Sequence, residues 1–307
     1  MNKRILIIGG GFIGKNLSLA FKNSGYRVRL FDKQNIQKDL KKFDQNQEIE
    51  YFRGDFLDQY DLDRTLKDAD YVYHCLSTTT PNTSNKNIIY DIDSNLKGTI
   101  NLLQLLKKNK NRYIVFCSSG GTVYGQNKYA NEDSPLNPSC SYGVIKISIE
   151  KYIIMFSMLY GLKYQILRLS NPYGAFQNYL QGQGVITTLI QKAISGDTFY
   201  LFGNKDIKKD YIYIEDLSEI AKNLLEKNIW NTTINVGSGK PTSLEDIINI
   251  LEKIHNKPIT IQNDSQKEHD IQNICLNNSK LLNFLPSTKF TPISEGIRKC
   301  YFRMLSE

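Results

Sequence analysis

The chain has 307 residues, enough for one or two domains around a sizeable core, and its 40% hydrophobic content is ordinary for a globular protein. No apolar run approaches the roughly 20 residues of a membrane span, and the five cysteines and three histidines show no metal-ligand spacing, so we expect a cytoplasmic protein without a membrane partner, a disulfide framework or a metal site. The formal charge of +8 is spread along the chain, which argues against a nucleic-acid partner and would suit a substrate with a diphosphate group.

The first 170 residues alternate short apolar runs with helical patterns. The expected strands cover residues 4–8, 27–31, 49–52, 71–76, 112–117 and 163–169. The expected helices between them cover residues 13–24, 61–69, 95–108 and 142–160. Such alternation predicts an α/β fold, a Rossmann-type doubly wound parallel sheet with helices on both faces.

The pattern changes after residue 170, where glycines and short elements dominate up to residue 209. The elements expected beyond that point are strands at 211–214 and 233–236 and helices at 216–227 and 243–255, followed by an irregular stretch, 257–307. We therefore predict a smaller C-terminal substrate-binding domain built from interleaved segments. It would consist of residues 171–208 and 240–307, and the cofactor-binding domain of residues 1–170 plus about 209–239.

A glycine-rich loop follows the first expected strand and opens the first helix. The run Gly9-Gly10-Gly11-Phe12-Ile13-Gly14 has the context of a dinucleotide fingerprint, in which glycines permit a tight turn and close approach of a pyrophosphate to a helix N-terminus. Asp32 ends the second strand, where an acid can accept from both ribose hydroxyls and repel a 2′-phosphate. This favours NAD over NADP, whereas the neighbouring Lys33 favours the opposite choice. Gly54-Asp55 ends the third strand, where the adenine would lie.

Tyr142 and Lys146 stand four residues apart at the start of the expected helix 142–160. This spacing places both side chains on one face of the helix. A lysine cation lowers the pKa of a nearby phenol, which is ordinarily about 10, and this would make Tyr142 a general base near neutral pH. The alternative interpretation is a surface pair on an ordinary helix.

The same helix is apolar nearly all round, although a helix packed only on its own sheet would show a polar stripe. Its apolar residues are Ile145, Ile147, Ile149, Tyr152, Ile153, Ile154, Met155, Phe156, Met158 and Leu159. Either this helix is unusually buried or its outer face meets a second subunit. We predict a homodimer.

Further motifs appear in the order typical of the extended short-chain dehydrogenase/reductases, and nearly the whole chain resembles the NAD-dependent nucleotide-sugar epimerases and dehydratases of that family. These motifs are His74 to Pro81, Asn95 to Thr99, Ser118 to Gly125, Tyr142 to Lys146, Arg168 to Gly174, Asp210 to Asp216 and Asn235 to Gly239. The resemblance implies bound NAD, a UDP-sugar substrate under the small C-terminal domain, and a homodimer formed through a four-helix bundle.

The resemblance also implies a set of site residues. Those expected to bind the cofactor are Gly9, Gly11, Phe12, Ile13, Gly14, Asp32, Asp55, Phe56, Leu76, Asn95, Tyr142 and Lys146. Those expected to bind the substrate are Asn171, Gln183, Val185, Lys209, Lys267 and Asp270. His74 is expected to be a packing residue, and Asn95 is expected to order the loop near the Tyr–Lys pair.

The chain departs from the family pattern at several positions. Relatives carry a catalytic hydroxyl four residues before the tyrosine of the Val-Tyr-Gly motif, and Gly120 stands there in this chain. Ser119 and Thr122 flank that position, and one of them must polarise the sugar hydroxyl; the place of Thr122 beside the strand end favours it. Ile8 occupies the place of the first loop glycine, so we expect a loop one residue shorter with its pyrophosphate site intact.

Two arginines that contact substrate in relatives are replaced by Lys209 and Lys267, which keep the charge but lose the bidentate fork. We predict epimerisation at C4 of a UDP-hexose, either UDP-glucose and UDP-galactose or their N-acetyl forms, through a transient 4-keto intermediate. A 4,6-dehydratase and a 4-keto-sugar reductase on the same fold are alternatives; the lack of an Asp-Glu pair in the Gly120 loop argues against the first and Asp32 against the second. A non-catalytic protein that binds dinucleotides or nucleotide sugars is an alternative of another class, left open by Gly120.

Overall fold

The computed structural model describes residues 3–34, 44, 46, 48–108, 113–177, 184–202, 204–264 and 273–306. Within these residues the largest feature is a seven-stranded sheet of order β11-β7-β5-β4-β1-β2-β3, in which every neighbouring pair is parallel. Its strands are β1 (Arg4–Ile8), β2 (Arg27–Asp32), β3 (Glu50–Arg53), β4 (Tyr71–His74), β5 (Tyr113–Ser119), β7 (Lys163–Leu169) and β11 (Thr232–Val236).

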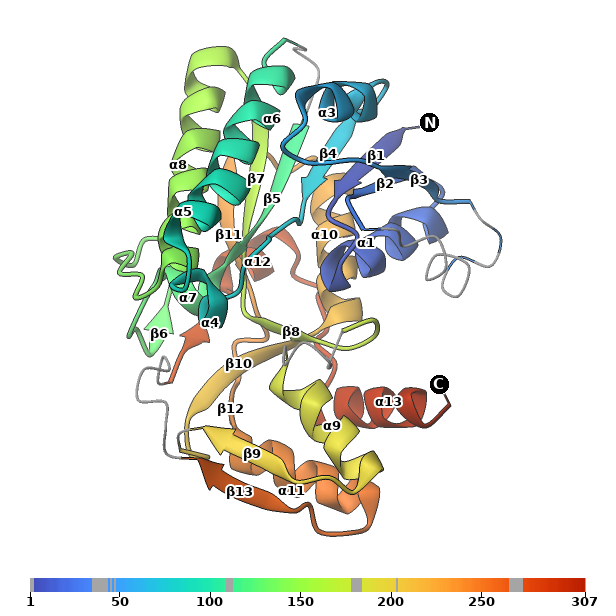
Figure 1. The fold of residues 1–307 in the computed structure, drawn as a ribbon, viewed down its shortest axis with the longest axis vertical. Coiled ribbons are helices and arrows are strands. Elements are labelled where there is room, and N and C mark those ends of the chain that lie inside the picture. The colour runs from blue at the N-terminus through green and yellow to red at the C-terminus, as the bar shows by residue number, and fades with distance from the viewer. Residues whose placement is uncertain are drawn as a thin grey trace.

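Helices cover both faces of this sheet (Figure 1). They are α1 (Phe12–Asn23) and α10 (Ile214–Glu226) on one face, and α3 (Gln59–Leu66), α6 (Gly98–Leu106) and α8 (Ser141–Tyr160) on the other. Successive residues of a strand point to opposite faces, so Ile5 and Ile7 join the hydrophobic cluster with α1 and α10, while Leu6 and Ile8 join the cluster with α6 and α8. The predicted doubly wound α/β fold is confirmed.

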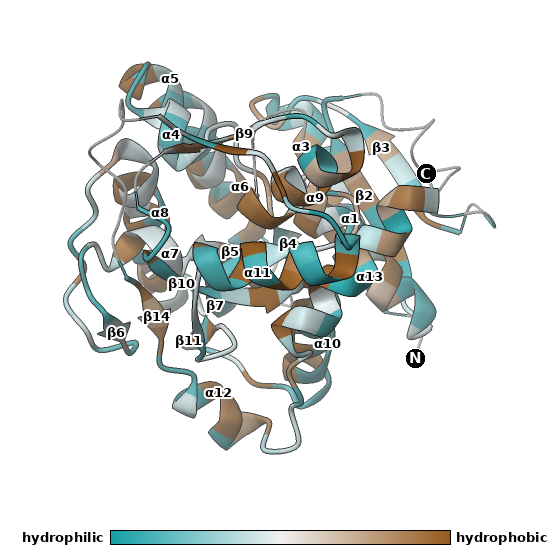
Figure 2. Cartoon of the chain, turned by 90° about the horizontal axis from the view of Figure 1, so that it is seen from below, coloured by the Kyte–Doolittle hydropathy of each residue, from teal (hydrophilic) through white to brown (hydrophobic). Residues whose placement is uncertain are grey.

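A smaller unit lies beyond the carboxyl ends of the sheet strands, in the lower part of Figure 1. It contains a three-stranded sheet of β8 (Asn171–Tyr173), β10 (Lys208–Tyr213) and β12 (Pro241–Ser243), and a parallel pair of β9 (Phe199–Phe202) and β13 (Ile261–Asp264). Its helices are α9 (Val185–Ser195), α11 (Leu244–His255) and α13 (Ile293–Ser306), which share one hydrophobic cluster. In Figure 2 α11 and α13 cross this unit, each with hydrophilic and hydrophobic residues alternating along it.

The expectation of an irregular stretch at 257–307 is wrong. Its described residues form β13, β14 (Cys275–Leu276), α12 (Ser279–Phe284) and α13, and β14 pairs with β6 (Tyr129–Ala130). α13 forms because its buried residues, Ile297, Cys300 and Tyr301, complete the cluster with α9 and α11. A second difference is that the helix expected at 95–108 is preceded by a π-helical segment (Ile92–Lys97) before α6 begins.

We propose that the chain divides into the cofactor-binding and substrate-binding domains expected from the sequence, with one addition. α12 contributes Leu281 to the hydrophobic cluster of the large sheet, where Leu285 joins it. The C-terminal segment would therefore return once to the first domain before it forms α13 in the second. No helix within the described residues is long and apolar enough to cross a membrane.

Candidate active site

The glycine loop lies between β1 and α1, at the carboxyl edge of the sheet. Gly9 has φ +103°, and a Cβ there would lie 2.7 Å from the Leu76 nitrogen, while a Cβ on Gly14 would lie 1.9 Å from the Gly9 carbonyl oxygen. A Cβ on Gly11 would meet nothing within 4 Å. Gly9 and Gly14 are thus required by packing, whereas Gly11 opens the approach to the N-terminus of α1, where Phe12 and Ile13 begin the helix. This cradle fits the pyrophosphate of NAD.

Asp32 and Asp55 stand beside this loop at the ends of β2 and β3. The Asp32 carboxylate accepts hydrogen bonds from the Gly10 nitrogen at 2.7 Å and the Gln34 nitrogen at 2.8 Å. The Lys33 ammonium lies 2.7 Å from Asp55, and this hydrogen bond lowers the pKa of Asp55 and raises that of Lys33. Asp55 therefore pairs with the Lys33 cation, which would otherwise favour NADP. Asp32 is the carboxylate that is hydrogen-bonded to the glycine loop.

Phe56 and Leu76 lie deeper than the sequence suggests. The Phe56 ring is buried, with its centroid 5.2 Å from that of His74, and a Cβ on Gly98 would lie 2.6 Å from the ring. The Leu76 backbone supports Gly9. His74 donates to or accepts from Thr99 at 2.8 Å, and burial lowers its pKa to about 3, so it stays a neutral packing residue.

A buried carboxylate that the sequence reasoning missed orders the N-terminus of α8. Asp91 accepts from Thr79 Oγ1 at 2.6 Å, from Asn95 Nδ2 at 2.8 Å and from Ser141 Oγ at 2.6 Å. Asn95 also exchanges hydrogen bonds with Thr78, at 2.8 and 2.9 Å. Asn95 therefore orders the loop as predicted, and Asp91 ties that loop to the residue before Tyr142. The only sequence signal for Asp91 is its place one helical turn before Asn95.

Tyr142 and Lys146 lie on one face of α8, as their spacing predicts. The Ser119 side chain lies near the Tyr142 hydroxyl and acts to lower its pKa. The Lys146 ammonium lies 5.3 Å from the centroid of the Tyr142 ring and 4.7 Å from that of Phe116, and it donates to the Cys117 carbonyl oxygen at 3.0 Å. The Tyr142 hydroxyl, the Ser119 side chain and the Lys146 ammonium thus lie together at the carboxyl end of β5.

The electrostatics of this pair differ from the sequence expectation. Burial raises the pKa of Tyr142 and outweighs the lowering by the nearby Ser119 side chain. Burial also lowers the pKa of Lys146, to about 8. The expected lowering of the Tyr142 pKa by Lys146 is therefore not observed, because the free-energy cost of removing the phenolate from water exceeds the stabilisation that the neighbouring groups give it. At neutral pH the structure holds a protonated tyrosine beside a lysine cation.

The two hydroxyls that flank Gly120 point differently. Thr122 is buried, its Cβ faces Gly143 of α8, and its Oγ1 lies 3.5 Å from the Ser119 carbonyl oxygen. Ser119, by contrast, lies near the Tyr142 hydroxyl and acts to lower its pKa. A Cβ on Gly121 would lie 4.0 Å from Ser119 Oγ and 3.7 Å from Asn171 Oδ1, so these two polar groups face the same side of the loop.

A side chain at Gly120, where the family's hydroxyl would stand, would require the Leu276 side chain to move. A Cβ there would lie 2.6 Å from Leu276 Cδ1 and 3.2 Å from the Arg168 carbonyl oxygen. Leu276 belongs to β14 and is buried, so a distant part of the chain fills the space in which the family's hydroxyl would begin.

A buried ion pair between β7 and α8 lies next to the segment that follows β5. Arg168 contacts Glu150 of α8 at 2.7 Å, and Glu150 also accepts from Ser118 at 2.5 Å. Arg168 donates to the Tyr124 hydroxyl at 2.9 Å, which donates in turn to Asn235 at 2.6 Å. This network ties β5, β7, β11 and α8 to Tyr124, and the sequence reasoning did not single out Glu150.

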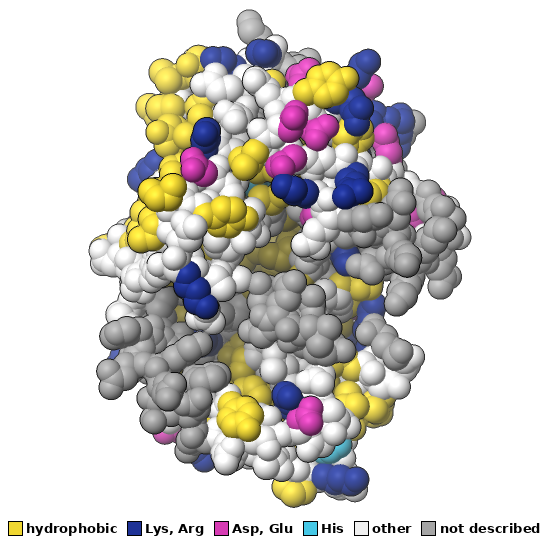
Figure 3. All heavy atoms as spheres, in the orientation of Figure 1, with side chains coloured by type: hydrophobic (Ala, Val, Ile, Leu, Met, Phe, Trp, Pro, Cys, Tyr) yellow, Lys and Arg dark blue, Asp and Glu magenta, His cyan; other side chains and the backbone are white. Residues whose placement is uncertain are grey.

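The predicted substrate residues that the structure describes come from three elements. Asn171 begins β8 and donates to the Asp210 carbonyl oxygen at 2.8 Å, Val185 begins α9, and Lys209 lies in β10. Gln183, Lys267 and Asp270 lie outside the described residues. Figure 3 shows a hollow on this face between the larger and the smaller unit.

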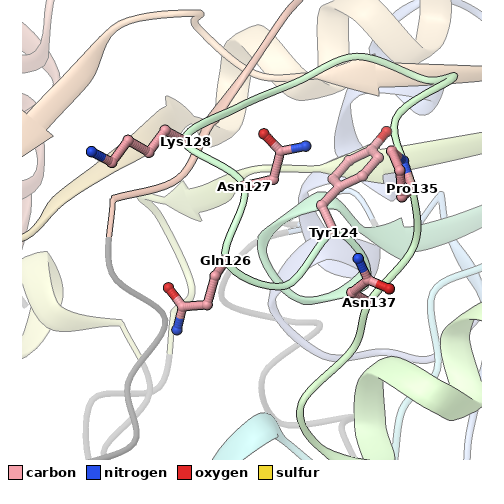
Figure 4. A pocket seen from close by; sticks show the side chains of 6 residues that line it. All are labelled: Tyr124, Gln126, Asn127, Lys128, Pro135 and Asn137. Carbon is pink, nitrogen blue, oxygen red and sulfur yellow. The ribbon is translucent and has the colours of Figure 1, made fainter.

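A separate pocket of about 360 Å³ lies beside the loop after Tyr124 (Figure 4). It is lined by Tyr124, Gln126, Asn127, Lys128, Pro135 and Asn137. None of the predicted site residues is among them, and its lining offers amides and one lysine in place of an acid–base pair. It is therefore not the site of the chemistry.

Comparisons with known proteins agree with this geometry. Residues 5–237 match the NAD dependent epimerase/dehydratase family. A protein of Methanocaldococcus jannaschii, provisionally named UDP-glucose 4-epimerase, is 35% identical over 273 residues, which cover 83% of this chain and 86% of that protein. The dTDP-4-dehydro-6-deoxyglucose reductase of Escherichia coli is 31% identical over 265 residues, covering 84% and 83% of the two chains.

The structure resembles that of UDP-glucuronic acid 4-epimerase from Bacillus cereus, solved with UDP-glucuronic acid and NAD. The TM-score is 0.89 at 28% identity, covering 98% of this chain and 99% of the other. The glycine cradle and Asp32 stand where a dinucleotide-binding fold places its pyrophosphate and ribose contacts. The chain therefore belongs to the NAD-dependent epimerase/dehydratase family of the extended short-chain dehydrogenase/reductases.

Proposed function

We propose that this protein is an NAD-dependent enzyme that epimerises a UDP-hexose at C4 through a 4-keto intermediate, acting on UDP-glucose and UDP-galactose or their N-acetyl forms. The observation that carries the proposal is the placement of Tyr142 and Lys146 on one face of α8, with the Lys146 ammonium 5.3 Å from the centroid of the Tyr142 ring and Ser119 near the Tyr142 hydroxyl. The relatives from M. jannaschii and B. cereus, both named as 4-epimerases of UDP-sugars, support it.

Tyr142 is the proton acceptor for the 4-hydroxyl in this scheme, and Ser119 polarises that hydroxyl. When bound, NAD supplies a carbon that takes up and returns a hydride, together with a positive charge beside the phenol. Because burial holds the proton on Tyr142, the phenol becomes a base only when such a charge favours the phenolate. Lys146 gives one of its three donors to the Cys117 carbonyl and offers the others to the nicotinamide ribose.

The substrate's charged end would lie between the two units. Asn171 faces the same side of the loop as Ser119, and Lys209 supplies a cation from β10. Val185 opens α9, where the uracil would lie. Gln183, Lys267 and Asp270 complete the proposed set of substrate ligands from outside the described residues.

We also propose a homodimer through α8. Six of its residues are exposed apolar side chains: Val144, Tyr152, Met155, Met158, Leu159 and Tyr160. Figure 3 shows hydrophobic side chains gathered at the place of α8. A second copy of the same face would remove this surface from water, as the family's four-helix bundle implies.

The catalytic assignment is tested by Tyr142→Phe. This variant should keep its NAD, measured by release and chromatography of the nucleotide, because the ring remains, and should lose at least about a thousandfold in turnover, within the range for a lost general base. Tyr129→Phe is the matched control, since Tyr129 is exposed on β6 away from the site. Near-normal turnover by Tyr142→Phe would overturn the assignment.

A reductase of 4-keto sugars is the second candidate, because the E. coli relative is named as one. Such an enzyme consumes a reduced coenzyme in each turnover, whereas an epimerase reuses the one it holds. Loss of NADH or NADPH absorbance on addition of dTDP-4-dehydro-6-deoxyglucose would favour the reductase. Its absence together with interconversion of UDP-sugars would favour the epimerase.

A further inference from the structure

Two thiols meet beneath the coenzyme site. Cys75 directly follows β4 and Cys117 lies in β5, and these neighbouring parallel strands pair His74 with Phe116 just before the two cysteines. Their sulfur atoms are 3.5 Å apart and hydrogen-bonded. The proposed catalysis uses the backbone of Cys117 but neither sulfur.

Both cysteines touch groups on which coenzyme binding depends. A Cβ on Gly9 would lie 3.1 Å from the Cys75 carbonyl carbon, so the peptide after Cys75 is the floor of the glycine loop. The Cys117 carbonyl oxygen accepts the hydrogen bond from Lys146 at 3.0 Å. A movement of either cysteine would therefore shift Gly9 or Lys146, the groups expected to bind the nucleotide.

We propose that Cys75 and Cys117 form an oxidation-sensitive dithiol, which peroxide converts into an intrachain disulfide that lowers the affinity for NAD. A disulfide needs its sulfurs about 2.05 Å apart, so the two must close by about 1.5 Å from their present contact. Cys75 is partly exposed and follows the end of its strand, while Cys117 is held within β5, so Cys75 and the floor under Gly9 make most of this movement.

The chemistry balances with peroxide as the oxidant. One thiolate attacks a peroxide oxygen, the O–O bond breaks, and hydroxide leaves and takes up a proton as water. The second sulfur then attacks the sulfenic sulfur, the S–O bond breaks, and the S–S bond forms with loss of a second water. Two thiols and one hydrogen peroxide thus give one disulfide and two waters.

The two sulfurs differ in acidity, because their mutual hydrogen bond and burial raise the pKa of Cys75 well above its ordinary value, so Cys117 supplies the thiolate of the pair. The hydrogen bond from Cys75 lowers the pKa of Cys117, and Lys146 acts in the same direction. Burial instead raises the pKa of Cys275 and of Cys300 to about 12, which keeps them as unreactive thiols. Cys140, which is partly exposed and directly precedes α8, serves as the control for oxidation of an accessible cysteine outside this pair.

The test is hydrogen peroxide titration of the purified full-length protein with the coenzyme it carries. Peptide mass spectrometry should find a Cys75–Cys117 crosslink that is lighter by two hydrogens and disappears with dithiothreitol, and bound NAD should fall at least about threefold and recover with it. The crosslink should persist in Cys140→Ser and vanish in Cys75→Ser.

Two results would overturn the proposal. One is oxidation of Cys140 in the wild-type protein with no Cys75–Cys117 crosslink, a readout that requires no variant to fold. The other is a crosslink formed without loss of NAD, which would leave a disulfide with no effect on the site. Neither readout depends on the substrate or on epimerase activity, so the proposal and the proposed function fail independently.

Discussion

At the scale of single residues, Ser119 and Thr122 differ in what their hydroxyl groups face. The Ser119 side chain lies near the Tyr142 hydroxyl and acts to lower its pKa, whereas Thr122 is buried against α8 and the loop backbone. Ser119→Ala should therefore lower kcat about 100- to 1000-fold, the usual cost of losing one polarising group. Thr122→Val, which keeps the shape of the side chain, should stay within about threefold of the wild type. Steady-state kinetics with a UDP-sugar compares them, and the reverse order would assign the role to Thr122.

The charge on Lys146 is expected to set the pH above which kcat/KM falls. Burial lowers its pKa to about 8, so the ammonium is present below that pH and is lost as the pH rises through it. If the cation is needed for coenzyme and phenolate, kcat/KM should fall roughly tenfold per unit above pH 8. A pH profile between 6.5 and 9.5, with protein stability followed in parallel, measures this limb. A flat profile across that range would show that the charge on Lys146 is not required.

The sequence predicted part of this site and not the rest, for physical reasons. Tyr142 and Lys146 follow from helical spacing, and the glycine loop from its place between a strand and a helix. The choice of Ser119 depends on Leu276, which fills the space at Gly120 from the far end of the chain. No local pattern contains such a contact. The raised pKa of Tyr142 likewise depends on burial, which only the assembled site defines.

At the scale of elements, two glycines between β1 and α1 have different roles: Gly14 is required by packing, and Gly11 leaves room for the cofactor. Gly11 has φ −79° and open space at its Cβ, so Gly11→Ala should fold with nearly unchanged stability. Its methyl group would stand where the pyrophosphate approaches, and NAD affinity should fall at least about tenfold. Gly14→Ala should instead cost about 1–3 kcal/mol of stability, because its Cβ meets the Gly9 carbonyl oxygen at 1.9 Å.

Thermal unfolding and NAD titration distinguish these two effects. The account predicts an unshifted melting temperature for Gly11→Ala and a lowered one for Gly14→Ala. An equal loss of stability in both variants would contradict the open space at Gly11, and unchanged NAD affinity of Gly11→Ala would contradict its role in binding.

Most strands of the large sheet were predictable because each is a short apolar run buried on both faces, the edge strand β3 with its exposed or half-buried residues being the exception. α13 was not, since its apolar residues gain a partner only when α9 and α11 are in place. β14 consists of two residues and pairs with β6, far away in the sequence, so it leaves no periodic signal. Local patterns thus defined the first unit and failed in the segments that complete the second.

At the scale of the whole molecule, the exposed face of α8 predicts a dimer. Light scattering at micromolar concentration should give twice the chain mass of 35.3 kDa. Met158 is 80% exposed and lies in that face, so Met158→Glu should shift the mass toward one chain by burying a charge at the interface. Phe302→Glu is the matched control, because Phe302 is equally apolar and 56% exposed but lies on α13. A monomeric wild-type protein would contradict the dimer.

Epimerisation at C4 is tested most directly by following the sugar itself. The purified protein is incubated with UDP-glucose, and separately with UDP-N-acetylglucosamine, without added reductant, and the anomeric protons are followed by NMR. The account predicts that the matching galacto epimer appears in at least one reaction, that the same final ratio is reached from either epimer, and that no reduced coenzyme is consumed. The account is contradicted if neither pair interconverts while the protein holds NAD.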